Sequence, residues 1–122
     1  LCFVIKKTDN DILACIRYWL IEIGFEKGLL LGPLAVRKDM QRHGLGSLLI
    51  NHSLKIAKEK KFNFCFVSGE SDYYPKFGFN RINQKNLILP GAIDPERLHI
   101  IFFEEGIENK MGDKPWTVKS SN

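Results

Sequence analysis

The sequence lacks any long apolar run. No stretch of its 122 residues approaches the roughly 20 consecutive apolar residues of a membrane-spanning helix, so we expect neither a transmembrane segment nor a membrane partner. The apolar start at residues 1–5 is short and no small-residue cleavage site follows it, which argues against a signal peptide. Because the chain begins with Leu1 instead of Met, within an expected strand, we expect further residues to precede it in the native protein.

Cysteine is scarce as well. Cys2, Cys15 and Cys65 lie far apart in apolar runs, and an odd number without CxxC spacing argues against a disulfide framework or a zinc site. We expect buried, reduced thiols in a cytoplasmic protein. The three histidines also lack the spacing of metal ligands, so we expect no metal.

A large excess of charge is missing too. The net charge is +4 and the basic residues form no long block, so a polyphosphate ligand explains the charge as well as nucleic acid does. A nucleic-acid-binding protein would carry aromatic residues among Lys and Arg on an exposed face, whereas the aromatic residues here lie mostly within apolar strands. We therefore expect no nucleic-acid partner.

The apolar pattern predicts a mixed sheet. Strands are expected at residues 1–6, 12–23, 29–36, 62–68, 79–82 and 98–104. A helix is expected from Gly44 to about Lys60, and a short one near Pro75, which fits only a first helical turn. This order indicates an α+β fold in α/β layers, with a mostly antiparallel sheet flanked by helices.

Two local features refine this organisation. Pro33 interrupts the strand at 29–36, and because proline donates no backbone hydrogen bond it predicts a bulge or a split there. We expect one domain over residues 1–105, followed by a polar, irregular tail at 106–122 that Trp116 anchors.

The segment Gln41-Arg42-His43-Gly44-Leu45-Gly46 joins a strand to a helix. Free N–H groups of a first helical turn and the helix dipole favour an anion, and glycines let a phosphate approach the backbone. Arg42 adds a positive charge that suits phosphate oxygens. Leu49 replaces the third glycine of a dinucleotide-binding loop, and Ser47-Leu48 replaces the Lys-Ser/Thr of a P-loop, so both of those motifs are excluded.

Together with its neighbours, this loop resembles a known motif. Leu31-Gly32-Pro33-Leu34-Ala35-Val36, the loop at 41–46 and Tyr73-Tyr74-Pro75-Lys76-Phe77-Gly78-Phe79 are similar to the acetyl-CoA region of GCN5-related N-acetyltransferases (GNAT), within a small bacterial subgroup. The resemblance covers roughly residues 1–105. It implies a GNAT-like fold that lacks part of the N-terminal region, since most members have a strand and two helices before this point that shape the acceptor pocket.

The resemblance also implies a set of cosubstrate contacts. The backbone of Leu34 and Val36 would bind the pantetheine arm of acetyl-CoA, in the gap between two splayed strands, and the N–H groups of residues 42–47 would hold the pyrophosphate. The full expected set is Leu34, Ala35, Val36, Gln41, Arg42, His43, Gly44, Leu45, Gly46, Ser47, Tyr74 and Phe77.

Transfer of an acyl group from a thioester to an amine needs a neutral amine, an oxyanion donor and a proton for the leaving thiolate. The resemblance makes Tyr74 the proton donor, whereas Tyr73 is expected in the core. The strand at 29–36 contains no carboxylate, so Glu22 and Glu70 are the candidate bases, with a water chain as the alternative.

The expected function is transfer of an acetyl group from acetyl-CoA to a primary amine of a small molecule or peptide, by direct attack in a ternary complex. The alternative is an acyl-CoA-binding module with little or no transferase activity, which the missing strand carboxylate favours. The partners are acetyl-CoA and an unidentified amine acceptor, and a homodimer is left open.

Overall fold

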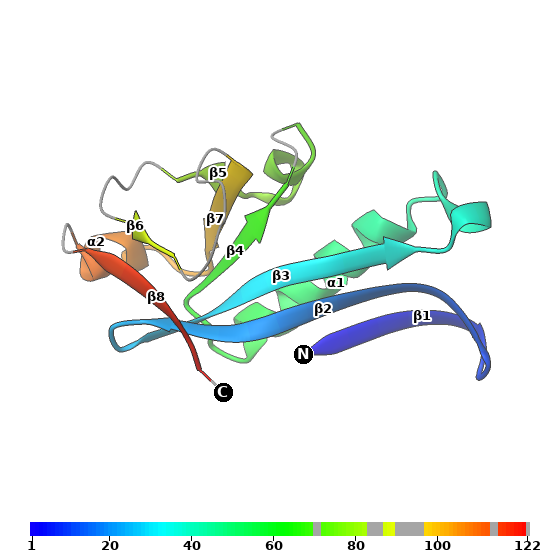
Figure 1. The fold of residues 1–122 in the computed structure, drawn as a ribbon, viewed down its shortest axis with the longest axis horizontal. Helices are drawn as coiled ribbons and strands as arrows, with labels where there is room; N and C mark the ends of the chain where they lie inside the picture. Colours follow the sequence, from blue (N-terminus) through cyan, green and yellow to red (C-terminus); the bar gives the residue numbers. More distant parts are fainter. Residues whose placement is uncertain (70–71, 83–86, 90–96, 113–114, 122) are drawn as a thin grey trace.

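The computed structural model describes residues 1–122 except 70–71, 83–86, 90–96, 113–114 and 122, and its strands form one curled mixed sheet (Figure 1). The strands lie in the order β5-β7-β4-β3-β2-β8-β6, and β1 pairs with β2. The elements are β1 (Cys2–Thr8), β2 (Asp11–Ile23), β3 (Glu26–Val36), η1 (Lys38–Met40), α1 (Leu45–Glu59), β4 (Phe64–Ser68), η2 (Tyr74–Phe77), β5 (Asn80–Arg81), β6 (Leu87–Ile88), β7 (Leu98–Phe102), α2 (Ile107–Met111) and β8 (Trp116–Ser120).

The first half of the chain is an antiparallel meander followed by a crossover helix. β1, β2 and β3 pair in sequence, α1 follows, and β4 then pairs in parallel with β3. β7 closes the other side of β4 as an antiparallel neighbour. The predicted α+β class and mixed sheet are confirmed.

One face of the sheet packs against α1. The helix buries residues at helical spacing, namely Leu49, Ile50, Ser53, Leu54 and Ala57. Ser53 is satisfied within this core, because its hydroxyl contacts the Leu49 carbonyl at 2.6 Å and the Tyr18 hydroxyl at 2.6 Å. Burial raises the pKa of Tyr18 well above its ordinary value, while the bond to Ser53 opposes part of that shift.

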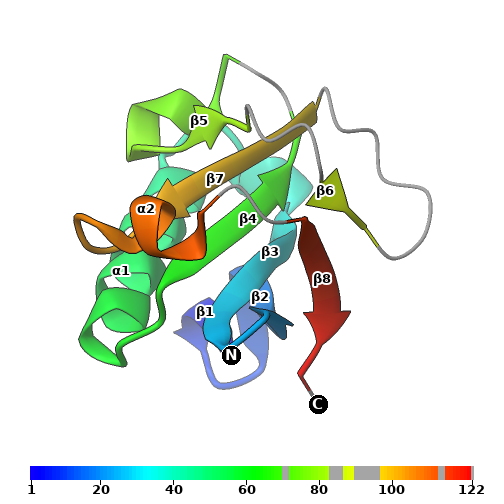
Figure 2. The ribbon, with the colours of Figure 1, turned by 90° about the vertical axis from the view of Figure 1, so that its left-hand side faces the viewer.

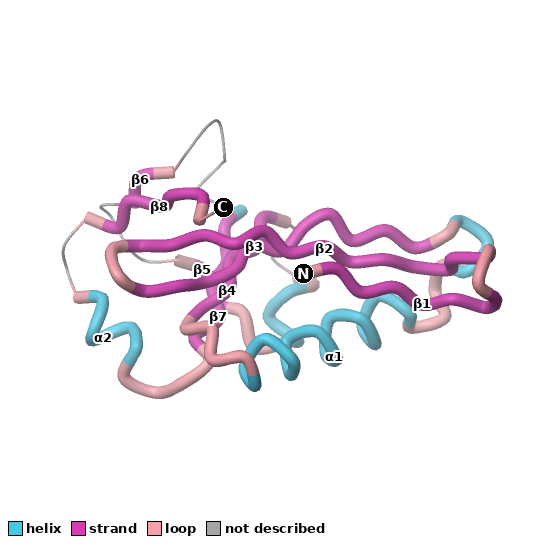
Figure 3. Tube along the Cα trace, turned by 90° about the horizontal axis from the view of Figure 1, so that it is seen from below, coloured by secondary structure: helices cyan, strands magenta, loops and turns pink. Residues whose placement is uncertain are grey.

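The opposite face carries a second core that includes the C-terminal residues. Trp116 and Val118 of β8 are 5% and 7% exposed and pack in a cluster with Phe64 and Phe66. Figure 3 shows α1 along one side of β1–β3, with β6 and β8 on the other side at one end. Figure 2 shows β8 next to β2 and β3, and β8 pairs with the hairpin end of β2. The segment 106–122 was expected to be an irregular tail; α2 and β8 correct that expectation, whereas the expected anchoring by Trp116 is confirmed.

The cysteines differ in their surroundings. Cys65 is buried, as expected, but Cys15 is half-buried and Cys2 is exposed on the edge strand β1, which corrects the expectation for that residue. No helix in the described ranges has the length and hydropathy needed to cross a membrane.

β3 has two partner strands in its first half and one in its second half. Its parallel pairing with β4 runs from Gly28 to Leu31, and beyond Leu31 the two strands diverge (Figure 1). On the β2 side the register shifts from Tyr18↔Leu31 to Ile16↔Leu34, so Gly32 and Pro33 form a bulge opposite one residue of β2. The predicted bulge and split at Pro33 are therefore confirmed, and Leu34–Val36 have no partner on the β4 side within the described chain.

Candidate functional site

The loop between β3 and α1 is held by a charged cluster at its start. Arg37 donates from Nε to Asp39 at 2.6 Å and also contacts Asp11 in the β1–β2 turn. The hydrogen bond from Arg37 lowers the pKa of the exposed Asp39 carboxyl. The Met40 N–H then donates to the Arg37 carbonyl at 2.8 Å and closes the 3₁₀ turn η1. The loop therefore leaves β3 in a defined direction.

The start of α1 is left open. Gly44 is its N-cap, with a left-handed φ of +77°, and no side chain among the described residues caps the first turn. Arg42 is also left-handed, with φ +70°. The first turn contains no acidic residue. Its unpaired N–H groups and the positive end of the helix dipole are therefore available to an anion.

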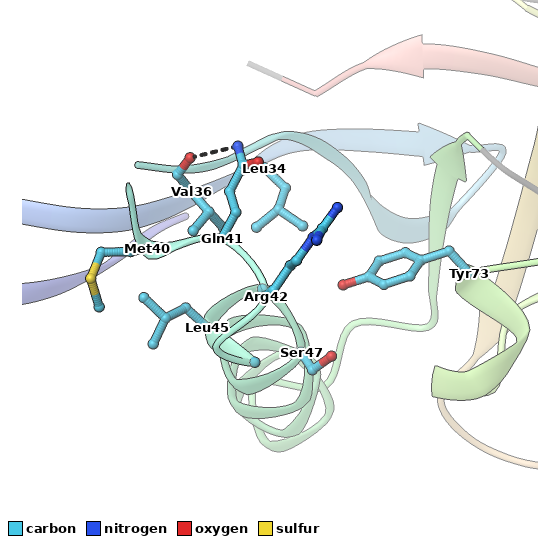
Figure 4. A pocket seen from close by; sticks show the side chains of 10 residues that line it. Leu34, Val36, Met40, Gln41, Arg42, Leu45, Ser47 and Tyr73 are labelled. Atoms are coloured by element: carbon cyan, nitrogen blue, oxygen red, sulfur yellow. Dashed lines mark hydrogen bonds between the residues drawn. The ribbon is translucent and has the colours of Figure 1, made fainter. Parts of the chain in front are cut away.

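A pocket of about 440 Å³ lies where this helix start meets the diverging half of β3 (Figure 4). Its lining consists of Leu34, Val36, Met40, Gln41, Arg42, Gly44, Leu45, Gly46, Ser47 and Tyr73. The Gln41 amide lies 3.4 Å from the Val36 carbonyl and joins the loop to the end of β3. The pocket is apolar on the β3 side and offers N–H groups and a guanidinium on the loop side.

Gly46 lies close to several side chains that line this pocket. A Cβ atom there would lie 3.2 Å from the Tyr73 hydroxyl oxygen, 3.6 Å from Leu34 and 3.9 Å from Val36. Two separate segments, β3 and the residue before η2, thus approach Gly46, and Figure 4 shows the Tyr73 hydroxyl pointing toward the helix start.

The two adjacent tyrosines lie in different surroundings. Tyr73 lines the pocket, and the Lys76 ammonium lies 4.9 Å from its ring centroid. Tyr74 packs away from the pocket lining, with its ring against Gly69 and edge-on to Phe79 at 5.9 Å. Burial raises the pKa of the Tyr74 hydroxyl, and Tyr73 adds to the shift. The tyrosine expected in the core is thus the one in the pocket.

The structure gathers most of the predicted contact residues. Eight of them line the pocket: Leu34, Val36, Gln41, Arg42, Gly44, Leu45, Gly46 and Ser47. Ala35, His43, Tyr74 and Phe77 do not. Ala35 alternates with its pocket-facing neighbours along β3, and Phe77 packs on the Tyr73 ring at 5.2 Å. Met40 and Tyr73 line the pocket without having been predicted.

The candidate bases are not brought to the pocket. Glu22 pairs with Lys27 of β3 and Lys119 of β8, at the hairpin end of the sheet. At about 3.3 Å per strand residue, Glu22 lies roughly 20 Å from Leu34 along the sheet, too far to contact a ligand there. Glu70 lies outside the described residues. Among the described residues, none that lines the pocket is a carboxylate or a histidine.

One buried histidine lies behind Tyr74. His99 of β7 is fully buried, its Nδ1 lies 3.0 Å from the Arg97 carbonyl, and its Nε2 has no hydrogen-bond partner in the described part of the chain. Its ring centroid is 6.4 Å from that of Tyr74. Across the residues that the structure describes, no group of three His, Cys, Asp or Glu side chains is arranged to hold a metal.

A family model described as the acetyltransferase (GNAT) domain matches residues 1–81. The chain belongs to the GNAT acetyltransferase family. The match includes β1–β4, the glycine loop and the two tyrosines, so the motif resemblance found in the sequence is confirmed. No protein with a curated description matches this GNAT chain by sequence.

Solved structures of GNAT proteins share its fold. The GNAT family N-acetyltransferase YhbS of Escherichia coli, solved with CoA, has a TM-score of 0.81 and 16% identity over 98% of this chain and 66% of its own. An acetyltransferase of Brucella melitensis, solved with acetyl-CoA, has a TM-score of 0.66 and 24% identity over 85% and 58%. A KacTA–DNA complex has a TM-score of 0.58 and 19% identity over 93% and 73%. This GNAT chain therefore spans 66% and 58% of the length of the first two structures.

Proposed function

We propose that this GNAT domain binds acetyl-CoA in the pocket beside Gly46 and transfers the acetyl group to a primary amine of a small molecule or peptide. The proposal rests on one observation: two parts of the chain with unused backbone hydrogen-bonding groups border the same pocket. The uncapped first turn of α1 and the half of β3 that has no partner on the β4 side both border it. The comparison proteins solved with CoA and with acetyl-CoA support the choice of ligand.

The helix start suits the pyrophosphate. A diphosphate carries several anionic oxygens, and the free N–H groups from Arg42 to Ser47 supply donors without a Cβ at positions 44 and 46 to block them. The Arg42 guanidinium, which borders the same pocket, adds a charge-assisted donor. Figure 4 shows this side chain extending over the helix start.

The free half of β3 suits the pantetheine arm. The Arg37 N–H donates to the Leu13 carbonyl on the β2 side. Because the hydrogen-bonding direction alternates along a strand, the N–H and C=O groups of Leu34 and Val36 face the gap left by β4. The amides of pantetheine are matched to such groups, because an extended ligand can pair with a strand edge as a peptide does. The pocket residues on this side are apolar, which suits the methylene groups of the arm.

The chemistry that the ligand supplies is a thioester whose carbonyl carbon an amine attacks. A C–N bond forms and the C–S bond breaks, so the amine loses a proton and the thiolate gains one. The backbone N–H of Leu34, which follows the bulge and faces the gap left by β4, is our candidate oxyanion donor. Tyr73 is now our first candidate for the thiolate proton because its hydroxyl lies in the pocket, and Tyr74 is the rival that the motif favours.

The missing base supports the alternative function. Because the described pocket lining contains no carboxylate or histidine, an acyl-CoA-binding module without its own base is the second candidate. If the domain is an enzyme, a water chain to a more distant group would instead remove the proton from the amine. The cytoplasmic location and the absence of a nucleic-acid partner also stay predictions.

The binding half is tested by calorimetric titration with CoA. Arg42→Glu reverses the charge in the pocket and is expected to weaken CoA binding about tenfold or more. Lys38→Glu makes the same charge change on the exposed turn before the loop and outside the pocket lining, so its affinity should stay close to that of the unchanged protein. Absence of CoA binding by the unchanged protein, or equal losses in both variants, would count against the proposed site.

The transfer half is tested by release of free CoA from acetyl-CoA in the presence of a panel of primary amines. Amine-dependent thiol release would support the enzyme. CoA binding without release over the whole panel would favour the binding module instead.

A further inference from the structure

Trp19 of β2 is a large side chain on the sheet face that α1 does not cover. Its neighbour Tyr18 faces α1 through the bond to Ser53, so Trp19 points to the opposite face, where it is 41% exposed. Trp19 belongs to neither of the two hydrophobic clusters among the described residues, so it adds less to the core than the buried aromatic residues do. Its contacts are specific: the indole Nε1 donates to the Gly32 carbonyl at 2.8 Å, and the Arg17 guanidinium carbon lies 4.2 Å from the ring centroid.

The acceptor of this hydrogen bond belongs to the bulge in β3. Gly32 and Pro33 together face a single residue of β2, so the regular ladder is interrupted there. Pro33 has no N–H to donate, and Gly32 has a φ of +145°. The indole N–H therefore gives the Gly32 carbonyl a partner at a point where the ladder between β2 and β3 is irregular.

The bulge also lies where the pocket begins. β4 leaves β3 after Leu31, and Leu34 is the first β3 residue that lines the pocket. Between these two residues only β2 holds β3 within the described chain, and the bulge weakens that hold. A side-chain hydrogen bond at Gly32 thus fixes the direction in which Leu34–Val36 leave the paired part of the strand.

We propose that Trp19 is a positioning residue for the acyl-CoA pocket: its indole, stacked under Arg17, holds the bulge at Gly32–Pro33 from the far face of the sheet. The inference rests on the proposed function for its ligand. Trp19 itself does not contact the ligand and acts through the backbone of β3.

The chain provides a matched control for the test. Trp116 also donates from Nε1 to a glycine carbonyl, that of Gly112, at 3.1 Å, but it lies in the second core and away from the pocket lining. Trp19→Phe and Trp116→Phe thus each delete one indole-to-glycine hydrogen bond and leave an aromatic ring. Trp116 is 5% exposed, so its replacement should lower the melting temperature at least as much as that of Trp19.

We expect Trp19→Phe to lower the affinity for CoA and Trp116→Phe to lower mainly the stability. In titrations with CoA, Trp19→Phe should bind about threefold more weakly or worse, on the scale of one ordinary hydrogen bond, whereas Trp116→Phe should keep its affinity. Equal affinities of Trp19→Phe and the unchanged protein, or parallel losses in both variants, would overturn the inference. Arg17→Gln, which leaves the indole N–H in place, should give a smaller loss in the same direction and serves if Trp19→Phe does not fold.

A measurement without ligand separates this inference from the proposed function. Amide hydrogen exchange of Ala35 and Arg37, whose N–H groups face β2 just beyond the bulge, should accelerate in Trp19→Phe and stay unchanged in Trp116→Phe. If the unchanged protein does not bind CoA, the proposed function fails, and the exchange still decides whether Trp19 holds the bulge. Unaltered exchange in Trp19→Phe would reject that holding role even if CoA binds well.

Discussion

At the scale of single residues, two glycines of the β2–β3 hairpin are required for different reasons. A Cβ at Gly28 would lie 2.3 Å from the buried Phe64 ring, whereas Gly24 has open space around it but a φ of +58°. Gly28→Ala should therefore cost about 1–3 kcal/mol through overpacking. Gly24→Ala should cost roughly 1 kcal/mol through backbone strain. Urea unfolding of both variants measures the difference, and a harmless Gly28→Ala would contradict the packing of β3 on β4.

The adjacent tyrosines allow a direct comparison at the site. Tyr73→Phe removes a hydroxyl from the pocket, and Tyr74→Phe removes one that lies outside its lining. With the best amine of the panel, Tyr73→Phe should lower kcat about tenfold or more, with little change in the KM for acetyl-CoA, while Tyr74→Phe should stay near the unchanged rate. The reverse ranking would return the proton-donor role to Tyr74.

Tyr18 predicts a dependence of stability on alkaline pH. Its pKa is raised in the folded state, so the unfolded chain loses this proton first as the pH rises above the ordinary value of 10.0. Stability is unaffected by this group below that pH and falls above it, by up to about 1.4 kcal/mol per pH unit. Denaturant midpoints between pH 9 and pH 11 should fall less steeply in Tyr18→Phe. Identical slopes would mean that the hydroxyl is not buried as described.

At the scale of elements, β8 shows what local sequence patterns miss. Residues 106–122 are mostly polar, and the alternation of Trp116 with Val118 is too short to mark a strand. The strand exists because it pairs with Ile21–Ile23 of β2, nearly a hundred residues earlier in the chain. Such pairing depends on the whole sheet, so the sequence revealed the anchor residue but not the element.

The contribution of β8 is measurable. Trp116→Ala should destabilise the domain by about 3–5 kcal/mol, because it leaves a cavity beside Phe102 in the second core. Thr117→Ala, one residue along the same strand and only half-buried, is the control and should have little effect. If Trp116→Ala lowers the free energy of unfolding only slightly in thermal or urea unfolding, the C-terminal segment is dispensable for the stability of the fold.

The sequence predicts those parts of the candidate site that residues close together in the chain determine. The glycine loop, the preceding Pro33 bulge and the helix start follow from neighbouring residues, so they were found in the sequence. Which tyrosine faces the pocket depends on the turn of η2 around Pro75, which a motif does not specify. Glu22 failed for a topological reason: the hairpin at Gly24 puts it at the end of β3 opposite the loop.

At the scale of the whole molecule, ligand binding should stabilise the fold. At a hundredfold excess over Kd, acetyl-CoA should add about 2.7 kcal/mol, which for a domain of this size raises the melting temperature by roughly 10 °C. ATP, which has phosphates but no pantetheine, is the control in the same thermal scan. An equal shift with ATP would mean that only the anion-binding helix start is in use.

The partner changes of β3 have a mechanical consequence. From Glu26 to Leu31 the strand is fixed on both sides, by β2 and by β4, and from Gly32 to Val36 it is fixed on one side only. We therefore expect the part of β3 in the core to be rigid and its end at the pocket to be compliant, as in a beam that is clamped at one end only. We expect deformation on ligand entry to be concentrated in the last five residues. Of these, Leu34 and Val36 contact the first core, and the second core need not rearrange. A domain of marginal stability can in this way adapt one wall of its pocket while most of its core packing stays unchanged.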